Sequence, residues 1–411
     1  MAYIVFVQPA VLGAAGMDPG AVLTATCLAA AFATVLMALL ANYPIAVAPA
    51  MGHNFFFAYS VVIGMKVPWR VALGGVAIAG LIFVVTAGLG LRERLITAIP
   101  TCLKHAIAAG IGLLIATIGF EWAGLIVAAP GTLVALGNLH DRSTCLALVG
   151  LALTCIMMAR RLPGALLWGM AATALLGVPL GVIGYHGVVG RPPSLLPTLL
   201  QLDVVGALAP GMVAAVSVFF LLALFDTVGT LVAVGGQAGL MREGTLPRAR
   251  QALLADAIGT VAGAMLGTST VTAYIESGAG VSVGGRTGLA SIVTGSLFVL
   301  CLFFYPLVRM IGGGYTAGGM TFYPVIAPAL VLVGTLMMGG LRRIDWDDPT
   351  EAIPSFLTII LMPLAVSITD GVGFGLVSYV LVKMAAGRTR EIHPLIAVFA
   401  VLLLSRYIVF R

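Results

Sequence analysis

The sequence has 411 residues, of which 61% are hydrophobic and only 9% are charged. A soluble domain carries about a quarter charged residues, so this composition excludes a soluble globular protein and indicates an integral membrane protein with many spans. The net charge is +6. In a membrane protein such an excess mainly reflects basic cytoplasmic loops, and we therefore expect no nucleic-acid partner.

Long apolar runs recur along the chain, and about fourteen of them approach the roughly 20 apolar residues that a transmembrane helix needs. The expected spans of the first half are residues 2–16, 20–41, 44–64, 69–90, 103–128, 143–159 and 163–184. Those of the second half are residues 209–235, 252–266, 268–283, 287–311, 324–340, 353–367 and 370–386. The N-terminus lacks a basic region and a separate cleavage site, so we expect no cleavable signal peptide.

Basic loops indicate the orientation of these spans. Most Lys and Arg residues lie in loops that follow even-numbered spans, namely 91–105, 159–164, 241–250, 284–288, 340–345 and 383–390. Because cytoplasmic loops are enriched in Lys and Arg, this pattern predicts a cytoplasmic N-terminus. A last apolar run, 394–410, is either a further span or an interfacial segment, and the orientation slightly favours the interface.

Seven spans followed by seven spans predict an internal repeat of inverted topology, since seven is odd. Spans 2 and 9 are both rich in small residues, which allow helices to pack closely. Each runs into an interrupted segment, residues 42–56 in the first half and residues 268–280 in the second. Paired interrupted spans are typical of the substrate site of a transporter.

Span 10 contains the sequence TSTVTAYIESGAG, which is unusual for a membrane helix. Residues 268–276 alternate in a way that predicts a short extended strand. The Ser277–Gly280 cluster predicts the start of a half-helix, with Ser277 as its N-cap. Such a break is tolerated at membrane depth only inside protein or beside a wet cavity. The free N–H groups at the positive end of a half-helix then offer hydrogen bonds to a ligand.

Two carboxylates lie inside expected spans, Glu276 in span 10 and Asp226 in span 8. An ionisable residue within a span is costly and marks a functional site by default. The alternatives are structural. Glu276 would cap the half-helix or bond a neighbouring span, and Asp226 would bond Thr227 or Thr230. We favour a functional role for both carboxylates.

Polar and aromatic residues adjoin the two broken spans. Asn54 occupies the place in span 3 that corresponds to the span-10 site, although a lone amide can also bridge helices. For His53 a structural role is favoured over a proton relay, the role for which imidazole is suited near neutral pH. Phe55, Phe56 and Tyr274 offer faces on which a flat ring can stack, with core packing as an equal alternative.

The remaining acidic residues are interpreted as structural. Asp256 is expected at the cytoplasmic end of span 9, bonded to backbone or to a basic loop, and Asp370 is expected to cap the half-helix that follows it. The acidic stretch IDWDDPTEAIP could hold a metal, but Asp348, Pro349 and Glu351 also fit the N-cap, N1 and N3 positions of a capping box. We favour the helix start.

A membrane enzyme is the alternative from another functional class. The sequence contains no HExxH or GxSxG motif. The five cysteines show no metal-ligand spacing, so we expect neither a metal nor another bound cofactor.

Four stretches together resemble one transporter family. They are APAMGHNFFFAY (48–59), FDTVGTLVAV (225–234), the segment 256–289 and the segment 344–383. They resemble the hypoxanthine/guanine/adenine permeases, the azaguanine-like branch of the nucleobase:cation symporter (nucleobase–ascorbate transporter) superfamily. The likeness runs in order from Met1 to about residue 395.

This resemblance implies an all-α polytopic membrane protein with about fourteen transmembrane segments in two inverted seven-span repeats, and short strands in broken spans 3 and 10. Residues 1–95 and 205–312 would form a core domain, and residues 96–190 and 320–390 a gate domain that also serves a homodimer. Residues 391–411 would follow as the C-terminal apolar segment. The implied activity is proton-coupled uptake of hypoxanthine, guanine or adenine across the cell membrane by an elevator-like core, with the proton as the coupling ion.

The resemblance also assigns site residues. The family's acidic positions in spans 8 and 10 fall on Asp226 and Glu276, and its span-3 Asn falls on Asn54. Tyr274 matches a position that adjoins the base, while Ser277 and Gly278 would donate from the half-helix to ring acceptors. From the chemistry of a flat, neutral base, we expect Glu276 to be a main anchor and Asp226 an anchor or proton site, or the reverse. His53 is a further candidate for proton coupling.

The chain departs from the family pattern at the expected site. Gln8 replaces an Asn in span 1, and Ala50, His53 and Phe55 differ from the pattern in span 3. The family also has a longer segment before MAYI, so span 1 is expected to be short. A xanthine or uracil symporter and an anion transporter of the same fold stay open as alternatives, because fold does not fix function. The acidic midplane charges argue against an anion.

Overall fold

The structure is a computed structural model that describes residues 1–89, 100–129, 131–241, 246–317 and 320–409. The elements of the first half are α1 (Ile4–Ala14), α2 (Pro19–Ala41), β1 (Val47–Pro49), α3 (Met51–Phe55), the π-helix η1 (Phe56–Gly64), α4 (Trp69–Gly88), α6 (Thr101–Trp122), β2 (Ile126–Ala129), β3 (Leu133–Leu136), α7 (Arg142–Ala159) and α8 (Ala165–Gly177). The basic loops 91–105 and 241–250 lie partly outside the described residues.

The second half repeats this plan. Its elements are α9 (Val204–Ala207), η2 (Pro210–Met212), α10 (Val213–Gln237), α11 (Ala249–Leu266), β4 (Val271–Ala273), α12 (Ser277–Ser282), α13 (Gly288–Cys301), η3 (Leu302–Phe304), α14 (Tyr305–Gly312), β5 (Tyr315–Ala317), β6 (Met320–Phe322), α15 (Ala327–Met337), η4 (Met338–Arg343), α16 (Pro349–Ala365), α17 (Ile368–Ala385), η5 (Thr389–Glu391) and α18 (Pro394–Val409).

Apolar helices occupy most of the expected spans. Among the described residues, seven helices are long and apolar enough to cross a membrane, and α1, α8 and α16 are shorter apolar helices. Spans 3 and 10 are broken into a short strand and a helix, as the sequence predicts. The protein is therefore a multi-pass membrane protein in which two spans are interrupted at corresponding places.

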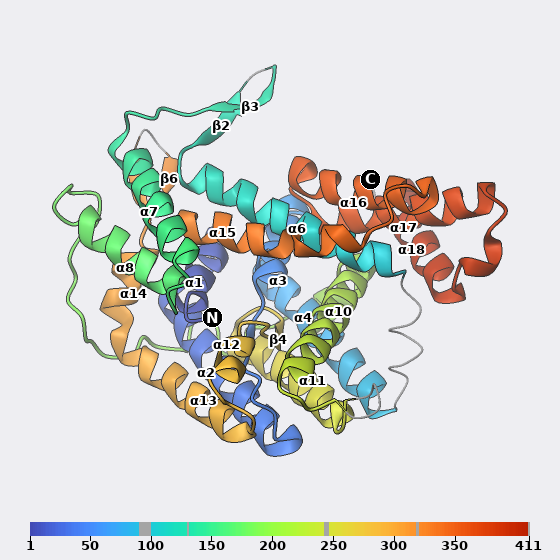
Figure 1. Ribbon diagram of the computed structural model, residues 1–411, viewed down its shortest axis with the longest axis horizontal. Helices are drawn as coiled ribbons and strands as arrows, with labels where there is room; N and C mark the ends of the chain where they lie inside the picture. Colours follow the sequence, from blue (N-terminus) through green and yellow to red (C-terminus); the bar gives the residue numbers. More distant parts are fainter. Residues whose placement is uncertain (90–99, 130, 242–245, 318–319, 410–411) are drawn as a thin grey trace.

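Several expected spans end earlier than hydropathy alone predicts. Span 5 was expected to reach residue 128, but α6 ends at Trp122 because Gly124 turns the chain with a φ of +71°. The chain then forms the β2–β3 hairpin, which projects from the top of the molecule (Figure 1). The end of the expected span, residues 126–128, belongs instead to strand β2 of this hairpin. Expected span 7 likewise ends at Gly177 instead of residue 184.

The two interrupted spans meet through their strands. β1 pairs antiparallel with β4, and Val47, Ala48 and Pro49 lie opposite Ala273, Thr272 and Val271. Every residue of both strands is buried. This two-stranded sheet joins the first half of the chain to the second half at the centre of the fold (Figure 1).

A threonine in each half holds the adjacent strand in the same way. Thr34 of α2 donates its hydroxyl to Val47 O at 2.8 Å and accepts from Val47 N at 2.9 Å. Thr260 of α11 donates to Val271 O at 2.8 Å and accepts from Val271 N at 3.3 Å. Because each hydroxyl satisfies backbone groups that a three-residue strand leaves unpaired, the interrupted spans remain stable inside the protein.

Small residues bring the helices around this sheet into close contact. A Cβ added at Gly259 of α11 would lie 2.6 Å from the Cβ of Ala33 in α2. A Cβ at Gly80 of α4 would lie 2.9 Å from Val261 of α11. Such contacts let backbones approach in a bilayer, where lipid is as apolar as the helix surfaces. The helices α2, α10 and α11 thus pack against β1 and β4, while α4 packs on α10 and α11, and α13 packs on α2 (Figure 1).

A second group of helices lies above this first group in Figure 1 and contains α6, α15, α16 and α17. Gly112 of α6 approaches Gly334 of α15, where a Cβ would meet the carbonyl oxygen at 2.8 Å. The last apolar run is a helix, α18, whose Ile396, Ala400 and Leu403 are buried against the rest of the protein. It packs mainly on α17.

Candidate substrate site

Glu276 lies between the end of β4 and the start of α12. It is half-buried, and the hydroxyl of Tyr3 donates a hydrogen bond to its Oε1 atom. The expectation that Ser277 caps α12 is wrong. Glu276 occupies the N-cap position without a side-chain cap, and the Ser277 hydroxyl instead accepts the backbone N–H of Ala46 at 3.0 Å. The Glu276 carboxylate is therefore oriented by Tyr3 and not by the helix.

Asp226 lies within α10, where the side chains around it on the helix are mostly buried. Its own side chain is 47% exposed. The Thr272 hydroxyl of β4 donates to its Oδ2 atom at 3.0 Å, and Nδ1 of His53 lies 4.0 Å from the same oxygen. Of the two structural alternatives, the bond to Thr227 is wrong, because the Thr227 hydroxyl donates to Asp256.

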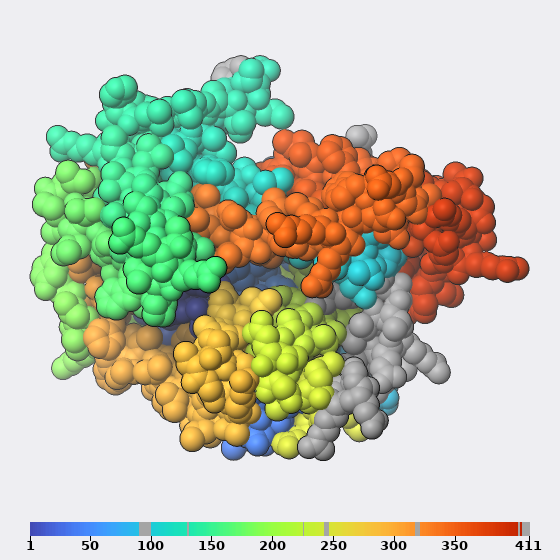
Figure 2. Space-filling model, in the orientation of Figure 1, coloured from blue at the N-terminus to red at the C-terminus, as the bar shows by residue number. Residues whose placement is uncertain are grey.

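The two carboxylates belong to one site. Asp226 and Glu276 are close enough to interact electrostatically, and both also interact with the Tyr3 and Tyr274 hydroxyls. The rings of Tyr3 and Tyr274 lie 6.4 Å apart between centroids. Strand β4 supplies Thr272 to one acid and leads directly into the other. The space-filling view shows a hollow in the surface between α15 above and α12 below (Figure 2).

Asn54 belongs to a buried polar chain beside the carboxylates. Its amide nitrogen donates to Gln8 Oε1 at 2.7 Å. Gln8 in turn donates to the hydroxyls of Thr268 at 3.0 Å and Ser269 at 2.8 Å. All four side chains are fully buried. This chain links α1, the broken span 3 and the broken span 10, so it aligns the three elements that carry the site.

The aromatic candidates divide into two groups. Phe55 stacks on Tyr59 at 5.8 Å, and Phe56 meets Phe219 edge-on at 4.6 Å. Both phenylalanines are fully buried and pack against these aromatic neighbours. Tyr274 lies between the carboxylates and is buried, and its hydroxyl donates to Pro49 O at 2.5 Å.

Gly278 lies in the first turn of α12, next to the end of α10. A Cβ there would lie 2.5 Å from Oε1 of Gln237. A larger residue at this position would displace the end of the Gln237 side chain. Helix α12 has only six residues, so the charge at its N-terminus is small compared with that of a full-length helix.

Asp256 is placed differently from the sequence expectation. It was expected at a cytoplasmic helix end beside a basic loop, but it lies within α11 and is fully buried. The Thr227 hydroxyl donates to its Oδ2 atom at 2.8 Å, and Asp256 interacts electrostatically with Asp226. Hydropathy shows that an acid interrupts an apolar run, but it does not show which face of the helix the acid occupies.

Tyr3 and Thr272 are further site residues that the sequence reasoning did not single out, whereas Gln8 was already named as a departure at the expected site. Neutral hydroxyl and amide side chains interrupt hydropathy only weakly, so composition gives no strong signal for them. The one signal for Tyr3 was its place in the MAYI segment that the resemblance covers. Their roles become visible only when the contacts to Glu276, Asp226 and Asn54 are seen.

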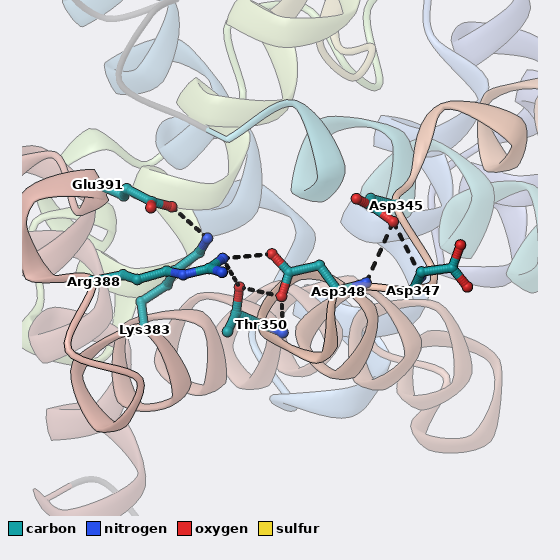
Figure 3. A network of polar contacts seen from close by, with 7 residues as sticks. All are labelled: Asp345, Asp347, Asp348, Thr350, Lys383, Arg388 and Glu391. Carbon is teal, nitrogen blue, oxygen red and sulfur yellow. Dashed lines mark hydrogen bonds and ion pairs between the residues drawn. The ribbon is translucent and has the colours of Figure 1, made fainter.

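The acidic stretch 344–354 forms a helix start, as expected. The Asp348 carboxylate accepts from Thr350 N at 2.9 Å and from the Thr350 hydroxyl at 2.8 Å, and it pairs with Arg388 at 2.7 Å (Figure 3). These Thr350 hydrogen bonds, followed by Arg388, lower the pKa of Asp348 to about 2. Asp345, and not Glu351, accepts the Asp348 N–H, at 3.3 Å, so the reciprocal half of the capping box is wrong.

Two further expectations concern the cap of α17 and a bound metal ion. Asp370 does not cap α17. Ser367 is the N-cap, and its hydroxyl accepts the backbone N–H of Asp370 at 3.2 Å. Within the described part of the chain, no cluster of three or more His, Cys, Asp or Glu side chains is arranged to hold a metal ion.

Comparison with known proteins agrees with this architecture. The chain is 43% identical over 409 residues to an adenine permease of Escherichia coli, covering 99% of this chain and 90% of that protein. It is 44% identical over 407 residues to a guanine/hypoxanthine permease of Bacillus subtilis, covering 96% and 90%. Among solved structures, it is similar to the transmembrane domain of a cyanobacterium bicarbonate transporter, with a TM-score of 0.67, 16% identity and coverage of 90% and 94%.

The solved structure shares the fold alone, since the identity is low. That fold has two inverted seven-span repeats arranged as core and gate. Residues 1–373 match the profile of the Permease family. Family membership makes the chain a membrane transporter and not an enzyme. The chain belongs to the Permease family of nucleobase–ascorbate transporters.

Proposed function

We propose that this protein takes up a purine base, in symport with protons, across the cell membrane. The observation that carries the proposal is the pair of carboxylates at the broken spans. Asp226 and Glu276 each receive one hydroxyl hydrogen bond, from Thr272 and Tyr3 respectively. Among the described residues, no hydrogen bond occupies the second oxygen of either carboxylate. Two open acceptors suit a flat, neutral ligand that carries ring N–H donors.

The names of the relatives support a purine as that ligand. By name, the Escherichia coli relative is an adenine permease and the Bacillus subtilis relative is a guanine/hypoxanthine permease. These bases are flat and carry both N–H donors and ring acceptors. The donors match the acid oxygens, while Tyr274 and the half-helix residues Ser277 and Gly278 border the same space. Glu276 acts as the main anchor, and Asp226 acts as anchor or proton site.

Proton coupling follows from the cost of moving charge. The two carboxylates interact electrostatically, so a negative charge on one makes a negative charge on the other less favourable. Carrying uncompensated negative charge through the membrane is costly, so a proton taken up with the base lowers the barrier to crossing. The inward proton gradient of the cell then drives accumulation of the base.

The moving part in this proposal is a core domain of residues 1–95 and 205–312. Its support is the β1–β4 sheet, the paired Thr34 and Thr260 contacts and the close packing around them. Residues 96–190 and 320–390 form the gate, which also carries a homodimer contact, and residues 391–411 follow it. The N-terminus faces the cytoplasm. The core crosses the membrane in an elevator-like movement with the base bound.

A xanthine or uracil symporter is the second candidate, because the family includes such permeases. An anion transporter is less consistent with the site. The solved structure of similar fold is a bicarbonate transporter. Here, however, the charged side chains described at the broken spans are Asp226 and Glu276, and both repel an anion.

The test is uptake of labelled hypoxanthine by cells that express the chain, with variants at Glu276. Glu276→Ala and Glu276→Gln should both lose uptake while membrane levels of protein stay near those of the parent. Asp18→Asn is the matched control, since Asp18 caps α2 away from the site. Competition by excess adenine, guanine, xanthine and uracil identifies the class of base. Retained uptake in Glu276→Ala, or competition by uracil alone, would contradict the proposal.

A further inference from the structure

His53 is a buried imidazole without a hydrogen-bond partner. The side chain is 3% exposed, and neither ring nitrogen makes a hydrogen bond to any described residue. The backbone of Leu222 lies beside the ring, but the geometry does not meet that of a hydrogen bond. An unsatisfied buried polar group costs about 1–3 kcal/mol, so a side chain of this kind requires an explanation.

The nearest charged group is the carboxylate of the proposed substrate site. Nδ1 of His53 lies 4.0 Å from Oδ2 of Asp226, which is within ion-pair reach but beyond hydrogen-bond reach. A shift of roughly 1 Å in the Asp226 side chain would close that gap. Asp226 has room to move because 47% of its side chain is exposed. Asp226 therefore lies between the open side of the site and the enclosed imidazole.

Other titratable groups act on Asp226 and not on the imidazole directly. The elements that pack on α3 are α1, α6, α10 and η1. Of the described residues that they carry, Asp226 is the acid within ion-pair distance of His53. Glu276, Asp256, Tyr3 and Tyr274 all interact electrostatically with Asp226. The state of His53 is thus linked to the rest of the site through a single carboxylate.

We propose that His53 and Asp226 hold the transported proton jointly, an inference that rests on the proposed symport of a base with protons. Water protonates Asp226 from the open side. The O–H bond of the carboxylic acid then breaks as an N–H bond forms at Nδ1 of His53, which leaves a carboxylate beside an imidazolium. The reverse transfer returns the proton to Asp226 and from there to water. The transfer involves no oxidation or reduction, and the pair has the same net charge in both arrangements.

This arrangement resolves a conflict between the two roles of Asp226. A protonated carboxylic acid is a poor acceptor for the N–H groups of a base, whereas a bare carboxylate carries charge across the membrane. With the proton on His53, Asp226 can accept from the base while the pair remains neutral. His53 thus acts through Asp226. It holds the proton on the enclosed side of that carboxylate while Asp226 binds the base.

The test uses purified protein in liposomes, with two measurements on the same vesicles. The first is accumulation of labelled hypoxanthine under an imposed inward proton gradient, together with the internal pH. The second is exchange of labelled for unlabelled hypoxanthine at equal pH on both sides, which needs no net proton movement. His53→Gln and His53→Leu should retain exchange and lose both accumulation and hypoxanthine-dependent acidification. His140→Leu, at an exposed loop histidine, should behave as the parent.

The outcomes separate this inference from the proposed function. If the parent is proton-coupled and both His53 variants are coupled equally well, the joint site is wrong and the symport stands. If the parent itself shows no acidification with hypoxanthine, proton coupling fails and the joint site fails with it.

A spectroscopic measurement covers the case in which a His53 variant does not fold. In the ¹⁵N spectrum of histidine-labelled parent protein, hypoxanthine should convert one buried imidazole to imidazolium between about pH 5 and 8, the range in which imidazole exchanges protons. The change should be absent from Asp226→Asn. A His53 ring that stays neutral with hypoxanthine bound throughout that range would overturn the inference.

Discussion

Tyr3 and Thr272 give the two site carboxylates different surroundings. Tyr3 is buried and donates to Glu276, whereas Thr272 belongs to the central strand pair and donates to Asp226. Glu276 is half-buried, and Asp226 is the more exposed of the two acids. A fixed anchor and a mobile acid follow from these contacts, in agreement with the division of roles that we propose.

Tyr3→Phe tests the orientation of Glu276. The variant removes one hydrogen bond to a charged acceptor, worth about 1.5–3 kcal/mol, so the affinity for the base should fall roughly ten- to a hundredfold. Calorimetric binding of hypoxanthine to purified protein measures this change. Tyr185→Phe, at an exposed tyrosine, is the control and should leave affinity unchanged. Equal affinities of the Tyr3 variant and the parent would show that Tyr3 does not orient the anchor.

At the scale of elements, the two interrupted spans depend on hydroxyl groups from neighbouring helices. Strands of three residues leave most of their backbone groups without strand partners. Thr34 and Thr260 satisfy such groups at equivalent places in the two halves. We infer that these threonines contribute to stability as well as to symmetry.

Thr260→Val should therefore lower the Tm of the protein in detergent. The valine keeps the shape of threonine but leaves both Val271 N and Val271 O without the hydroxyl, for a loss of about 1–3 kcal/mol. Thr86→Val is the matched control, because the Thr86 hydroxyl bonds only carbonyls within its own helix among the described contacts. A Tm loss no greater than that of the control would show that the strand does not need Thr260.

Helix packing gives a second prediction at this scale. Gly259→Ala would place a Cβ 2.6 Å from that of Ala33 and force α2 and α11 apart. Overpacking of this kind costs about 1–3 kcal/mol and should lower the Tm. Gly236→Ala, with no atom within 4 Å of the added Cβ, should not lower it. Equal Tm values for the two variants would contradict close packing of these helices.

The α16 helix start adds a prediction on pH. The pKa of Asp348 is lowered to about 2, so its contribution to stability is present above its unfolded value of about 3.9 and is lost as the pH falls through about 2. Between about pH 5 and 8 that contribution is constant. Arg388→Ala should thus lower the Tm equally at both ends of that range, with Arg390→Ala as the control. A Tm loss that differs between the two pH values would contradict this account.

At the scale of the whole molecule, hydropathy predicts the number and order of spans but not their breaks in detail. The small-residue pattern of spans 2 and 9 correctly indicated the paired interruptions. The β2–β3 hairpin was missed because the apolar residues 126–128 of β2 continue the hydropathy of the span that precedes them. Hydropathy does not report which face of a helix a residue occupies. It therefore could not distinguish the exposed acid Asp226 from the buried acid Asp256.

The site itself was predictable only in part. Charge at membrane depth marks Asp226 and Glu276 because such residues are rare in spans. The hydroxyls that orient them come from Tyr3 and Thr272, which lie far from their partners along the sequence in both cases. Contacts across such separations are set by tertiary packing, which local patterns do not encode.

The central claim, purine transport driven by protons, is tested most directly by hypoxanthine uptake in cells that express this chain, with and without a protonophore. The account predicts accumulation that the protonophore abolishes and that excess guanine or adenine, but not uracil, suppresses. Accumulation that persists with the proton gradient collapsed would contradict proton coupling. Well-expressed protein that takes up uracil and ignores purines would contradict the assignment of the substrate.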